Sequence, residues 1–255
     1  MEAKYTAIFP TNSLINLENC ATSLLVNSKK LESIIIIWDG DHDSFLNFSK
    51  TNSCKRVKYV ENPGAHADVY GMFNFGASLS LSEYILFVND DMYFPQDWDE
   101  KILFERRSVI TFVVVESGFV KASEKVIVYP FGLDWNTFKK DEFENFAQNF
   151  PRRYEIKDNE LGWFMPVLFS KFLFFEAGAY PNKSPFPHPN DAIFFEKLKH
   201  TSKIKFVQIT SPIYHFQSLS QRKLGLFTKL YYYYLARFSH ARALPFFTKH
   251  KHEKN

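Results

Sequence analysis

Polar side chains follow three apolar stretches of the sequence, at the points where strands would end. Residues 4–9, 33–38 and 83–88 are short, apolar and rich in strand-forming residue types. The polar residues that follow them are Thr11 and Asn12, then Asp39, then Asn89, Asp90 and Asp91. In an open parallel sheet, ligands bind beyond the carboxyl ends of the strands. Together these side chains therefore predict one binding site, although each alone would suit an ordinary polar turn.

Asp90 and Asp91 are adjacent carboxylates, and such a pair repels unless a cation compensates it. Mg²⁺ and Mn²⁺ prefer oxygen ligands, keep part of their water shell and commonly bridge to substrate phosphates. The pair thus indicates a site for a divalent metal and a diphosphate. The alternative is a β-turn or a helix cap that leads into residues 95–97.

The front of the chain alternates predicted strands and helices. Strands are predicted at 4–9, 33–38, 57–60 and 83–88, helices at 14–25 and 68–80, and a loop at 39–44. Such alternation builds a parallel sheet through right-handed crossovers. The unbroken apolar run SIIIIW suits a strand that is buried on both faces. We therefore expect an α/β, Rossmann-like fold with a mostly parallel central sheet flanked by helices.

The rest of the chain is less regular. Strands are predicted at 109–115, 125–130, 162–170 and 205–210, and helices at 134–150 and 192–199. No internal repeat or low-complexity linker separates the front of the chain from the back. Residues 1–218 are therefore predicted to form a single domain.

The composition is that of an ordinary globular protein, except for its aromatic content. Hydrophobic residues make up 45% and charged residues 23% of the 255, and the net charge of +3 is too small to indicate nucleic acid as a partner. Cys20 and Cys54 lie in no metal-ligand spacing, which argues against a disulfide framework or a zinc site. The 29 Phe, 13 Tyr and 4 Trp fit a compositional bias, sugar-stacking surfaces or an apolar docking face. Trp98, Trp135 and Trp163 are candidates for stacking on a sugar, with core packing as the alternative.

The sequence shows neither a signal peptide nor a membrane span. The longest apolar runs, 34–38 and 109–115, are much shorter than the roughly 18 residues that a spanning helix needs. We therefore expect a cytoplasmic protein. Residues 219–255 form a basic, aromatic tail without acids before Glu253. As a helix this tail would lie on the inner face of an anionic membrane or pack on a partner; the alternative is a terminal helix packed on its own domain.

Several motifs in order resemble the family 2 glycosyltransferases of GT-A fold. The matching segments are IFPTNS, IIIIWDGDHD, YGMFNFGASLSLSEYILFVNDDMYFPQDW, GWFMPVLFSKFLFFEAGAYPNKSPFPHPNDAIFFEKL and SPIYHFQSLS. That family has a P-x-x-N turn after its first strand, an acidic turn after its second, and an N-x-G helix before a D-x-D-type motif. An E-D pair at a helix start and a late strand ending in histidine follow. The resemblance covers about residues 5–218, with a nucleotide-binding half at 1–100 and an acceptor-binding half at 101–218.

The resemblance implies a donor site in the front half. Pro10, Thr11 and Asp39 would bind the nucleotide, with Thr11 and Asp39 in contact with its base. Asn89 and Asp90 would lie near the ribose and the diphosphate. The implied donor is a nucleotide-sugar, with a UDP-sugar favoured.

The resemblance also implies a metal and a catalytic base. Asp91 would be the main ligand of Mn²⁺ or Mg²⁺, and His215 would help to bind the metal or the diphosphate. Asp191 would be the base of an inverting transfer to a hydroxyl of a glycan or lipid-linked acceptor. Asn74 matches the asparagine of the N-x-G helix, for which a structural role is expected.

Asp191 also fits the role of a base on physical grounds. It opens the predicted helix at 192–199, where the helix dipole favours the ionised form of an acid by about 0.3–1 kcal/mol. A plain capping acid would occupy the same position. His215 follows an apolar strand and precedes a polar loop, which suits a ligand and a structural histidine equally.

Three departures from the family pattern concern metal affinity and donor identity. Asn89 and Asn190 replace the first acids of the D-x-D motif and the E-D pair, and Phe73 stands where many relatives have Arg. A non-catalytic glycan- or nucleotide-binding protein is therefore an alternative. A sugar-1-phosphate nucleotidyltransferase is a weaker one, since PTNSL lacks a Gly-rich, basic phosphate loop.

Overall fold

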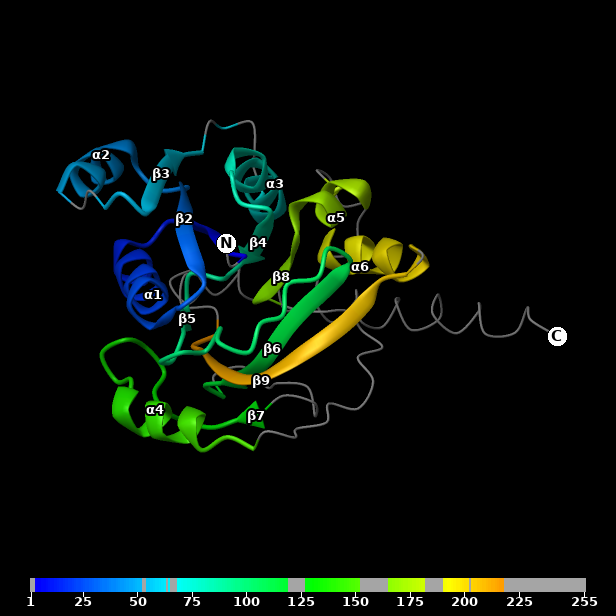
Figure 1. Ribbon diagram of the computed structural model, residues 1–255. Coiled ribbons are helices and arrows are strands. Elements are labelled where there is room, and N and C mark those ends of the chain that lie inside the picture. The colour runs from blue at the N-terminus through cyan, green and yellow to red at the C-terminus, as the bar shows by residue number, and fades with distance from the viewer. Residues whose placement is uncertain are drawn as a thin grey trace, which may run out of the picture.

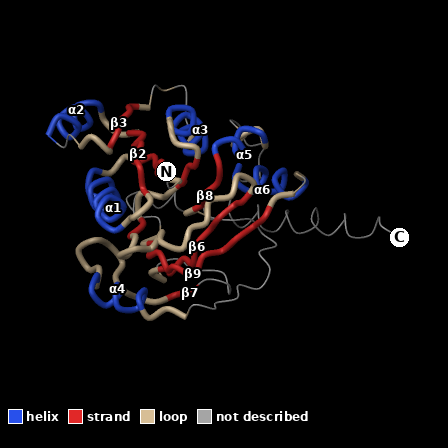
Figure 2. Tube along the Cα trace, viewed as in Figure 1, coloured by secondary structure: helices blue, strands red, loops and turns tan. Residues whose placement is uncertain are grey.

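One mixed sheet organises the protein. The computed structural model describes residues 3–51, 54–62, 64, 68–118, 127–151, 165–181, 190–201 and 203–217. Their strands form a sheet of order β3-β2-β1-β4-β8-β6-β9-β5, and β7 pairs with β6 (Figure 1). Figure 2 shows the strands running through the middle of the molecule with helices around them. Trp163 and the tail at 219–255 lie outside the described residues.

The front half forms the parallel part of the sheet. Its strands are β1 (Tyr5–Thr11), β2 (Leu31–Trp38), β3 (Val57–Glu61) and β4 (Tyr84–Phe87), all parallel, with β1 between β2 and β4. Its helices are α1 (Leu14–Asn27), α2 (His42–Thr51) and α3 (Val69–Leu79). The predicted alternation of strands and helices is confirmed. Side-chain caps begin two of the helices: Ser13 accepts from Asn16 N in α1, and Asp68 accepts from Gly71 N in α3.

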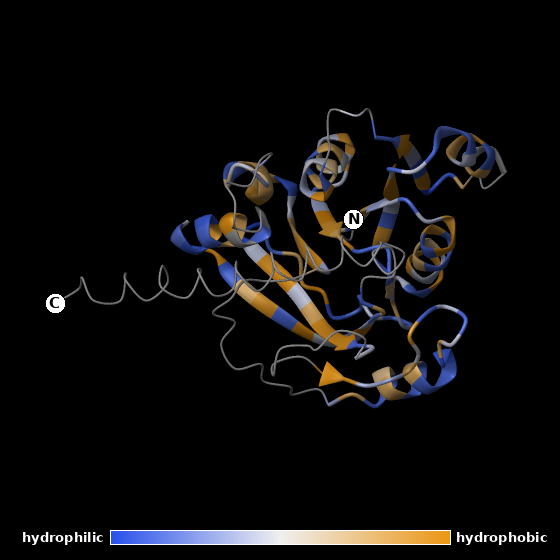
Figure 3. Ribbon diagram, turned by 180° about the vertical axis from the view of Figure 1, so that it is seen from behind, coloured by the Kyte–Doolittle hydropathy of each residue, from blue (hydrophilic) through white to orange (hydrophobic). Residues whose placement is uncertain are grey.

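The isoleucine run of β2 explains why helices cover both faces of the sheet. Ile34 and Ile36 point into one core, which α1 covers, and Ile35 and Ile37 point into the other, which α3 covers. Successive side chains of a strand alternate between the faces, so an unbroken apolar run requires two cores. Figure 3 shows hydrophobic residues concentrated on these strands, with the hydrophilic ones on the outer sides of the helices.

The back half adds antiparallel pairs. β8 (Val167–Ser170) lies between β4 and β6 (Ser108–Glu116) and is antiparallel to both, whereas β9 (Lys205–His215) is parallel to β6. β5 (Met92–Tyr93) pairs antiparallel with the end of β9, and β7 (Ile127–Val128) pairs parallel with the end of β6. The remaining helices are α4 (Lys140–Gln148), α5 (Lys171–Glu176) and α6 (Asn190–His200).

Two of the predicted helix boundaries are wrong, and side-chain hydrogen bonds explain both. The helix predicted from residue 134 begins at 140, because Thr137 N donates to Asp134 Oδ1 at 2.9 Å and closes a separate turn there. The loop predicted at 39–44 contains the start of α2, where Ser44 N donates to Asp41 Oδ1 at 2.7 Å. The short helix α5 was not predicted from the sequence; Ser170 caps it by accepting from Leu173 N.

The last strand is longer than predicted and contains a bulge. β9 continues past residue 210 to His215, and its register against β6 shifts between Phe112 and Val113, which pair with Ile209 and Pro212. Proline lacks a donor N–H, so a bulge is one of the few places where a strand tolerates it. After the bulge the pairing resumes and places His215 opposite Glu116.

The abundant aromatic residues mainly fill cores. Trp98 is buried against Tyr5, Phe94 and Phe112, which confirms core packing for this tryptophan. A third cluster of Tyr93, Phe131, Phe143, Tyr214 and Phe216 packs α4 against the ends of β5 and β9. Within the described ranges, no helix is long and apolar enough to cross a membrane.

Gly76 allows α3 to lie directly on β1. A Cβ atom built at this position would come within 2.3 Å of Ile8 Cγ2, well inside van der Waals contact. The glycine of the N-x-G motif is therefore required by packing rather than by backbone conformation.

We predict that Gly76→Ala destabilises the protein. Alanine is the better helix former by about 1 kcal/mol, but overpacking a core costs about 1–3 kcal/mol and here acts against a buried strand. Urea unfolding should give a lower free energy of unfolding than wild type. Ser78→Ala, on the exposed side of α3, is the control and should be neutral or stabilising. A Gly76→Ala protein as stable as wild type would show that α3 can shift away from β1.

Candidate functional site

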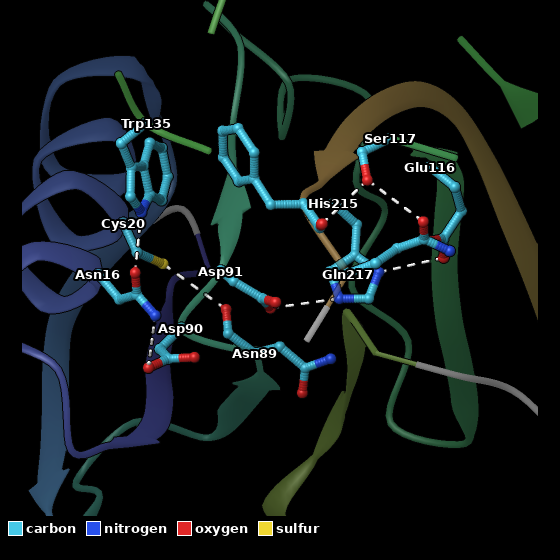
Figure 4. Close-up of polar contacts among 11 residues, drawn as sticks. Asn16, Cys20, Asn89, Asp90, Asp91, Glu116, Ser117, Trp135, His215 and Gln217 are labelled. Carbon is cyan, nitrogen blue, oxygen red and sulfur yellow. Dashed lines mark hydrogen bonds and ion pairs between the residues drawn. The ribbon is translucent and has the colours of Figure 1, made fainter. Parts of the chain in front are cut away.

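The ends of β1, β4, β6 and β9 bring a group of polar residues together at one edge of the sheet. Thr11 ends β1, Asn89, Asp90 and Asp91 follow β4, and His215 ends β9. Figure 4 shows the side chains of Asp90, Asp91 and His215 with their neighbours from α1 and β6. The contact between Thr11 and Asp90 agrees with the rule that polar residues at the ends of parallel strands share one edge.

Asp90 is fixed by hydrogen bonds from the front half of the chain. Thr11 Oγ1 donates to Asp90 Oδ2 at 2.6 Å, and Asn16 Nδ2 donates to the same oxygen at 3.3 Å. Asn16 Oδ1 in turn accepts from Trp135 Nε1 at 3.0 Å (Figure 4). Thr11 and Asn16 are buried, so these donors are held by the core. The orientation of the Asp90 carboxylate is therefore fixed by the protein itself.

The backbone of Asn89 is held by the α1 thiol. Cys20 Sγ donates to the carbonyl oxygen of Asn89 at 3.8 Å. Burial, and then the negative charges of Asp90 and Asp91, raise the pKa of the Cys20 thiol well above its usual value. Cys20 therefore stays protonated and remains a donor to this turn.

Asp91 lies in a chain of ionic contacts that crosses three strands. His215 Nε2 is 3.2 Å from Asp91 Oδ1, and His215 Nδ1 is 3.1 Å from Glu116 Oε1. The exposed fractions of these side chains are only 6% for Asp91, 18% for His215 and 14% for Glu116. We call Asp91, His215 and Glu116 the ionic triad.

His215 is the cation of the ionic triad. Burial by itself would lower the pKa of His215, but the charge of Asp91 and the hydrogen bonds to Asp91 and Glu116 outweigh it and raise the pKa to about 10. A protonated imidazole donates from both ring nitrogens, which matches an acceptor on each side. The positive charge thus compensates two buried carboxylates.

Glu116 is a site residue that the sequence analysis missed. It is the last residue of β6 and lies opposite His215 in the pairing with β9. Its Oε2 atom is buried and makes no hydrogen bond within the described part of the chain. The signal was present, because Glu116 is an acid directly after the apolar run at 109–115. The strand-end rule was applied to the front half and not to this strand.

Asp39 lies at the same edge but has other partners. Its N–H donates to Thr11 O at 2.8 Å, and its carboxylate accepts from Asn62 Nδ2 at 2.8 Å. Its side chain is exposed at the end of β2, beside the strand that carries Pro10 and Thr11. Asp39 is therefore joined to Thr11 by a backbone hydrogen bond and is not part of the ionic triad.

Asp191 is surrounded by a second group of residues. It lies in the first turn of α6, and burial together with the charge of Asp191 raises the pKa of Tyr70, at the start of α3. Its charge also acts on Tyr180, which precedes the segment leading to α6. The side chain of the neighbouring Asn190 lies outside the described residues.

Asn74 and Phe73 have structural roles in this region. Asn74 Nδ2 donates to Tyr180 O at 2.8 Å, and Asn74 Oδ1 accepts from Tyr180 N at 3.0 Å, as a structural asparagine should. Phe73 is fully buried against Phe87, with ring centroids 4.7 Å apart. Phe73 therefore belongs to the core and makes no phosphate site.

The residues of the ionic triad suit a divalent cation that shares its coordination with a substrate. Asp91 offers carboxylate oxygens, and His215 would offer its Nε2 nitrogen once the metal displaces the proton there, since a ligating imidazole must be neutral. Mg²⁺ or Mn²⁺ is usually held by one or two carboxylates plus phosphates and water. Among the described residues, no group of three or more His, Cys, Asp or Glu side chains could hold a metal by itself. The donor set fits a cation only together with a phosphate ligand.

Solved structures with this sheet and these helices have the GT-A fold of glycosyltransferases. A TarS structure from S. aureus matches 83% of this chain and 60% of its own with a TM-score of 0.55 and 13% identity. A structure of GalNAc-T7 with UDP, GalNAc and Mn²⁺ matches 84% of this chain and 44% of its own with a TM-score of 0.59 and 12% identity. The chain thus spans less than two thirds of the length of these structures. At such identities the likeness establishes the fold.

The family follows from the sequence itself. The model of glycosyl transferase family 2 matches residues 11–180. The chain belongs to this family, which confirms the expected resemblance. A search of curated proteins finds no match.

We predict that Glu116→Gln destabilises the protein in a pH-dependent way. The folded pKa of His215, about 10, lies above its ordinary value of 6.5, so the stabilisation is complete below pH 6.5 and is lost as the pH rises through 10. In metal-free buffer, Glu116→Gln should lower the free energy of unfolding by about 1–3 kcal/mol at pH 6, with a smaller deficit near pH 10. Denaturant titrations at both pH values measure this, and an equal deficit at both would contradict it. Glu142→Gln, on an exposed face, is the control.

Proposed function

We propose that this protein is a metal-dependent, inverting glycosyltransferase that moves a sugar from a nucleotide-sugar, most simply a UDP-sugar, to a hydroxyl of a glycan or lipid-linked acceptor. Membership of family 2 supports glycosyl transfer as the reaction. The single observation that carries the finer proposal is the convergence of Asp90, Asp91 and His215 at the carboxyl edge of the parallel strands. This is the edge where an α/β sheet binds its nucleotide.

The proposed donor site runs along the ends of β1, β2 and β4. Pro10 and Thr11 end β1, and Asp39 follows β2 with an exposed carboxylate that suits the edge of a nucleotide base. Asn89 and Asp90 would contact the ribose and the diphosphate. The support for this assignment is that the Asp90 carboxylate is already oriented by Thr11 and Asn16.

Asp91 and His215 would hold the cation. A bound Mn²⁺ or Mg²⁺ would supply positive charge to the leaving nucleoside diphosphate. The GalNAc-T7 structure, which contains UDP and Mn²⁺, supports this use of a metal within the fold. Glu116 would orient the His215 ring through Nδ1, because the partner of one imidazole nitrogen fixes how the other is presented.

Asp191 would be the catalytic base. A carboxylate oxygen of Asp191 would accept the proton of the acceptor hydroxyl, while that hydroxyl oxygen bonds to the anomeric carbon and the bond from this carbon to the diphosphate breaks. Attack on the face opposite the leaving group inverts the anomeric centre in one step. The support is the position of Asp191 in the first turn of α6, where the helix dipole favours the ionised form.

A second candidate function is binding without catalysis. Asn89 takes the place of an acid in the motif after β4, and what the structure shows of this residue is a backbone carbonyl held by Cys20. A protein that binds the nucleotide-sugar would keep the oriented Asp90 and need no base. Release of nucleoside diphosphate from the donor distinguishes the two, since a binding protein turns nothing over.

Peripheral membrane contact through residues 219–255 remains a separate proposal.

We predict that Asp191→Asn abolishes transfer while nucleotide binding persists. Loss of a general base lowers the rate by about 10²–10⁴, whereas the donor contacts lie elsewhere. Sugar transfer and the Kd for the nucleoside diphosphate with Mn²⁺ should both be measured. An active Asp191→Asn protein would rule out this base. Glu196→Gln, a half-exposed residue of the same helix that pairs with Lys199 and His200, is the matched control.

We predict that one nucleoside diphosphate stabilises the protein only in the presence of the metal. A ligand at about a hundred times its Kd raises the free energy of unfolding by about 2.7 kcal/mol. A thermal-shift screen of UDP, GDP, CDP and dTDP, each with Mn²⁺ or with EDTA, should select UDP and show the dependence. Asp91→Asn should remove the Mn²⁺-dependent part, and Asp43→Asn, on exposed α2, should keep it. Equal shifts for wild type and Asp91→Asn would exclude Asp91 as the ligand.

A further inference from the structure

An exposed aromatic surface lies beyond the end of β6, next to the ionic triad, and the proposed donor site does not use it. An open hollow of about 320 Å³ is lined there by Tyr129, Phe131, Glu142, Asn145 and Phe146. These residues come from the segment after β7 and from α4, which lie side by side in Figure 1. We call the five residues the aromatic hollow. Its volume is at the lower end of the range for ligand sites, which is about 300–1,000 Å³.

A tight turn at Pro130 brings two rings of the aromatic hollow together. Phe131 N donates to Tyr129 O at 2.9 Å across the proline, whose fixed φ suits a turn of this size. The rings of Tyr129 and Phe131 stack with centroids 4.4 Å apart and an interplanar angle of 25°. The Phe146 ring supports both, with centroids 5.9 and 5.3 Å away. Because Phe131 is only 3% exposed and Tyr129 is 49% exposed, the Tyr129 ring is a supported surface that is open to solvent.

Helix α4 adds polar groups to this surface. Glu142, Asn145 and Phe146 are three and four residues apart, so they share one face of the helix. Asn149 Nδ2 donates to Asn145 Oδ1 at 3.0 Å and thereby orients the amide, and Asn145 Nδ2 donates to no residue in the described part of the chain. The Glu142 carboxylate is exposed and pairs with Lys139 at 3.2 Å. The aromatic hollow thus offers a donor and an acceptor beside its rings.

The aromatic hollow is joined to the strand ends that carry the ionic triad. Tyr129 N donates to Glu116 O at 3.1 Å, so the exposed ring is attached directly to a residue of the triad. The hydroxyl of Tyr214, the residue before His215, donates to Gly132 O at 2.6 Å. The turn that carries the rings is therefore bound to both β6 and β9. A ligand in the aromatic hollow would lie next to the carboxyl edge of the sheet.

These groups match the chemistry of a sugar ring. The C–H groups on the face of a pyranose pack on the negative face of an aromatic ring, and Tyr129 presents such a ring. The hydroxyls at the rim of the sugar need donors and acceptors, which Asn145 and Glu142 provide. Glu142 is the charged residue among the five and would repel an acidic sugar. The lining therefore favours a neutral sugar.

We propose that the aromatic hollow binds a sugar ring of a neutral glycan acceptor, with Tyr129 as the stacking surface and Asn145 as a hydrogen-bond donor. This inference rests on the proposed transfer to a glycan and adds the residues that would recognise that glycan. Binding of one ring in the hollow would hold another part of the same glycan near the edge where the donor is proposed to bind, which raises the local concentration of acceptor hydroxyls.

Glycan binding can be measured without turnover. In protein labelled with ¹³C in its tyrosine rings, the Tyr129 signal is the one absent from Tyr129→Phe. Maltohexaose, cellohexaose and hexa-N-acetylchitohexaose are the neutral probes, and a hyaluronan hexasaccharide is the acidic one. At least one neutral probe should shift the Tyr129 signal with a Kd of about 1 mM, as expected for a small contact surface. The proposal is overturned if no neutral probe shifts this signal up to about 10 mM, or if hyaluronan binds more tightly.

Variants of the aromatic hollow test the roles of its residues, with affinity measured from the broadening of the probe's own NMR signals. Tyr129→Ala removes the stacking surface and should weaken binding of the neutral probe about fivefold. Asn145→Ala keeps all three rings and should weaken it about threefold. Phe175→Ala, at a half-exposed ring of α5 outside the hollow, is the matched control and should bind like wild type.

Unchanged affinity in a folded Tyr129→Ala protein would overturn the proposal. If that variant fails to fold, unchanged affinity in Asn145→Ala would overturn it, because Asn145 is exposed and its replacement disturbs no core. A second copy of the chain is the competing occupant. If the protein sediments as a dimer and Tyr129→Ala as a monomer, the hollow is an interface between copies and the proposal is wrong.

Failure of the glycan site is distinguishable from failure of the proposed function. The binding measurements use neither metal nor donor, so binding at Tyr129 without any transfer supports the glycan site and rejects the reaction. Conversely, sugar transfer by a protein whose Tyr129 signal no neutral probe shifts supports the reaction and rejects the glycan site.

Discussion

The carboxyl edge of the sheet depends on one electrostatic constraint: two carboxylates that are largely shielded from water flank one imidazole. Asp91 follows β4, Glu116 ends β6 and His215 ends β9. A buried carboxylate without a partner is strongly unfavourable, so these strand ends can lie together only where a positive charge compensates them. His215 provides that charge, and the same residue pairs with Met92 of β5 and Glu116 of β6. His215 therefore pairs with both neighbouring strands and also compensates the two negative charges.

The parts of the fold that the sequence predicted are those encoded within a single element. The isoleucine run at 34–37 determines burial on both faces, and polar residues after the apolar runs lie at the edge of the candidate site. In the structure, Thr11 donates a hydrogen bond to Asp90. The next residue, Asp91, contacts His215. These features depend on local periodicity and on the geometry common to parallel sheets, which a sequence alone contains.

The parts that were missed depend on which elements become neighbours. Glu116 becomes a site residue because β9 pairs with β6 across a bulge, and no local pattern specifies that partner. The start of α4 was placed too early because the hydrogen bond from Thr137 N to Asp134 competes with helix formation. The hydrogen bonds of Asn74 with the backbone of Tyr180 likewise join segments that are distant in the sequence. Contacts between such distant elements cannot be predicted from residue propensities or from the spacing of residues in the sequence.

The two cores of the sheet support the two halves of the proposed site separately. The core on the α1 side contains Cys20, Trp38 and Met92, and it holds the turn that carries Asn89 and Asp90. The core on the α3 side contains Phe73, Tyr180 and Phe194, and it holds the helix starts that carry Tyr70 and Asp191. Phe73 is fully buried in this second core against Phe87. Apolar packing therefore lies under the proposed base, whereas the residues around Asp90 belong to the core on the other face.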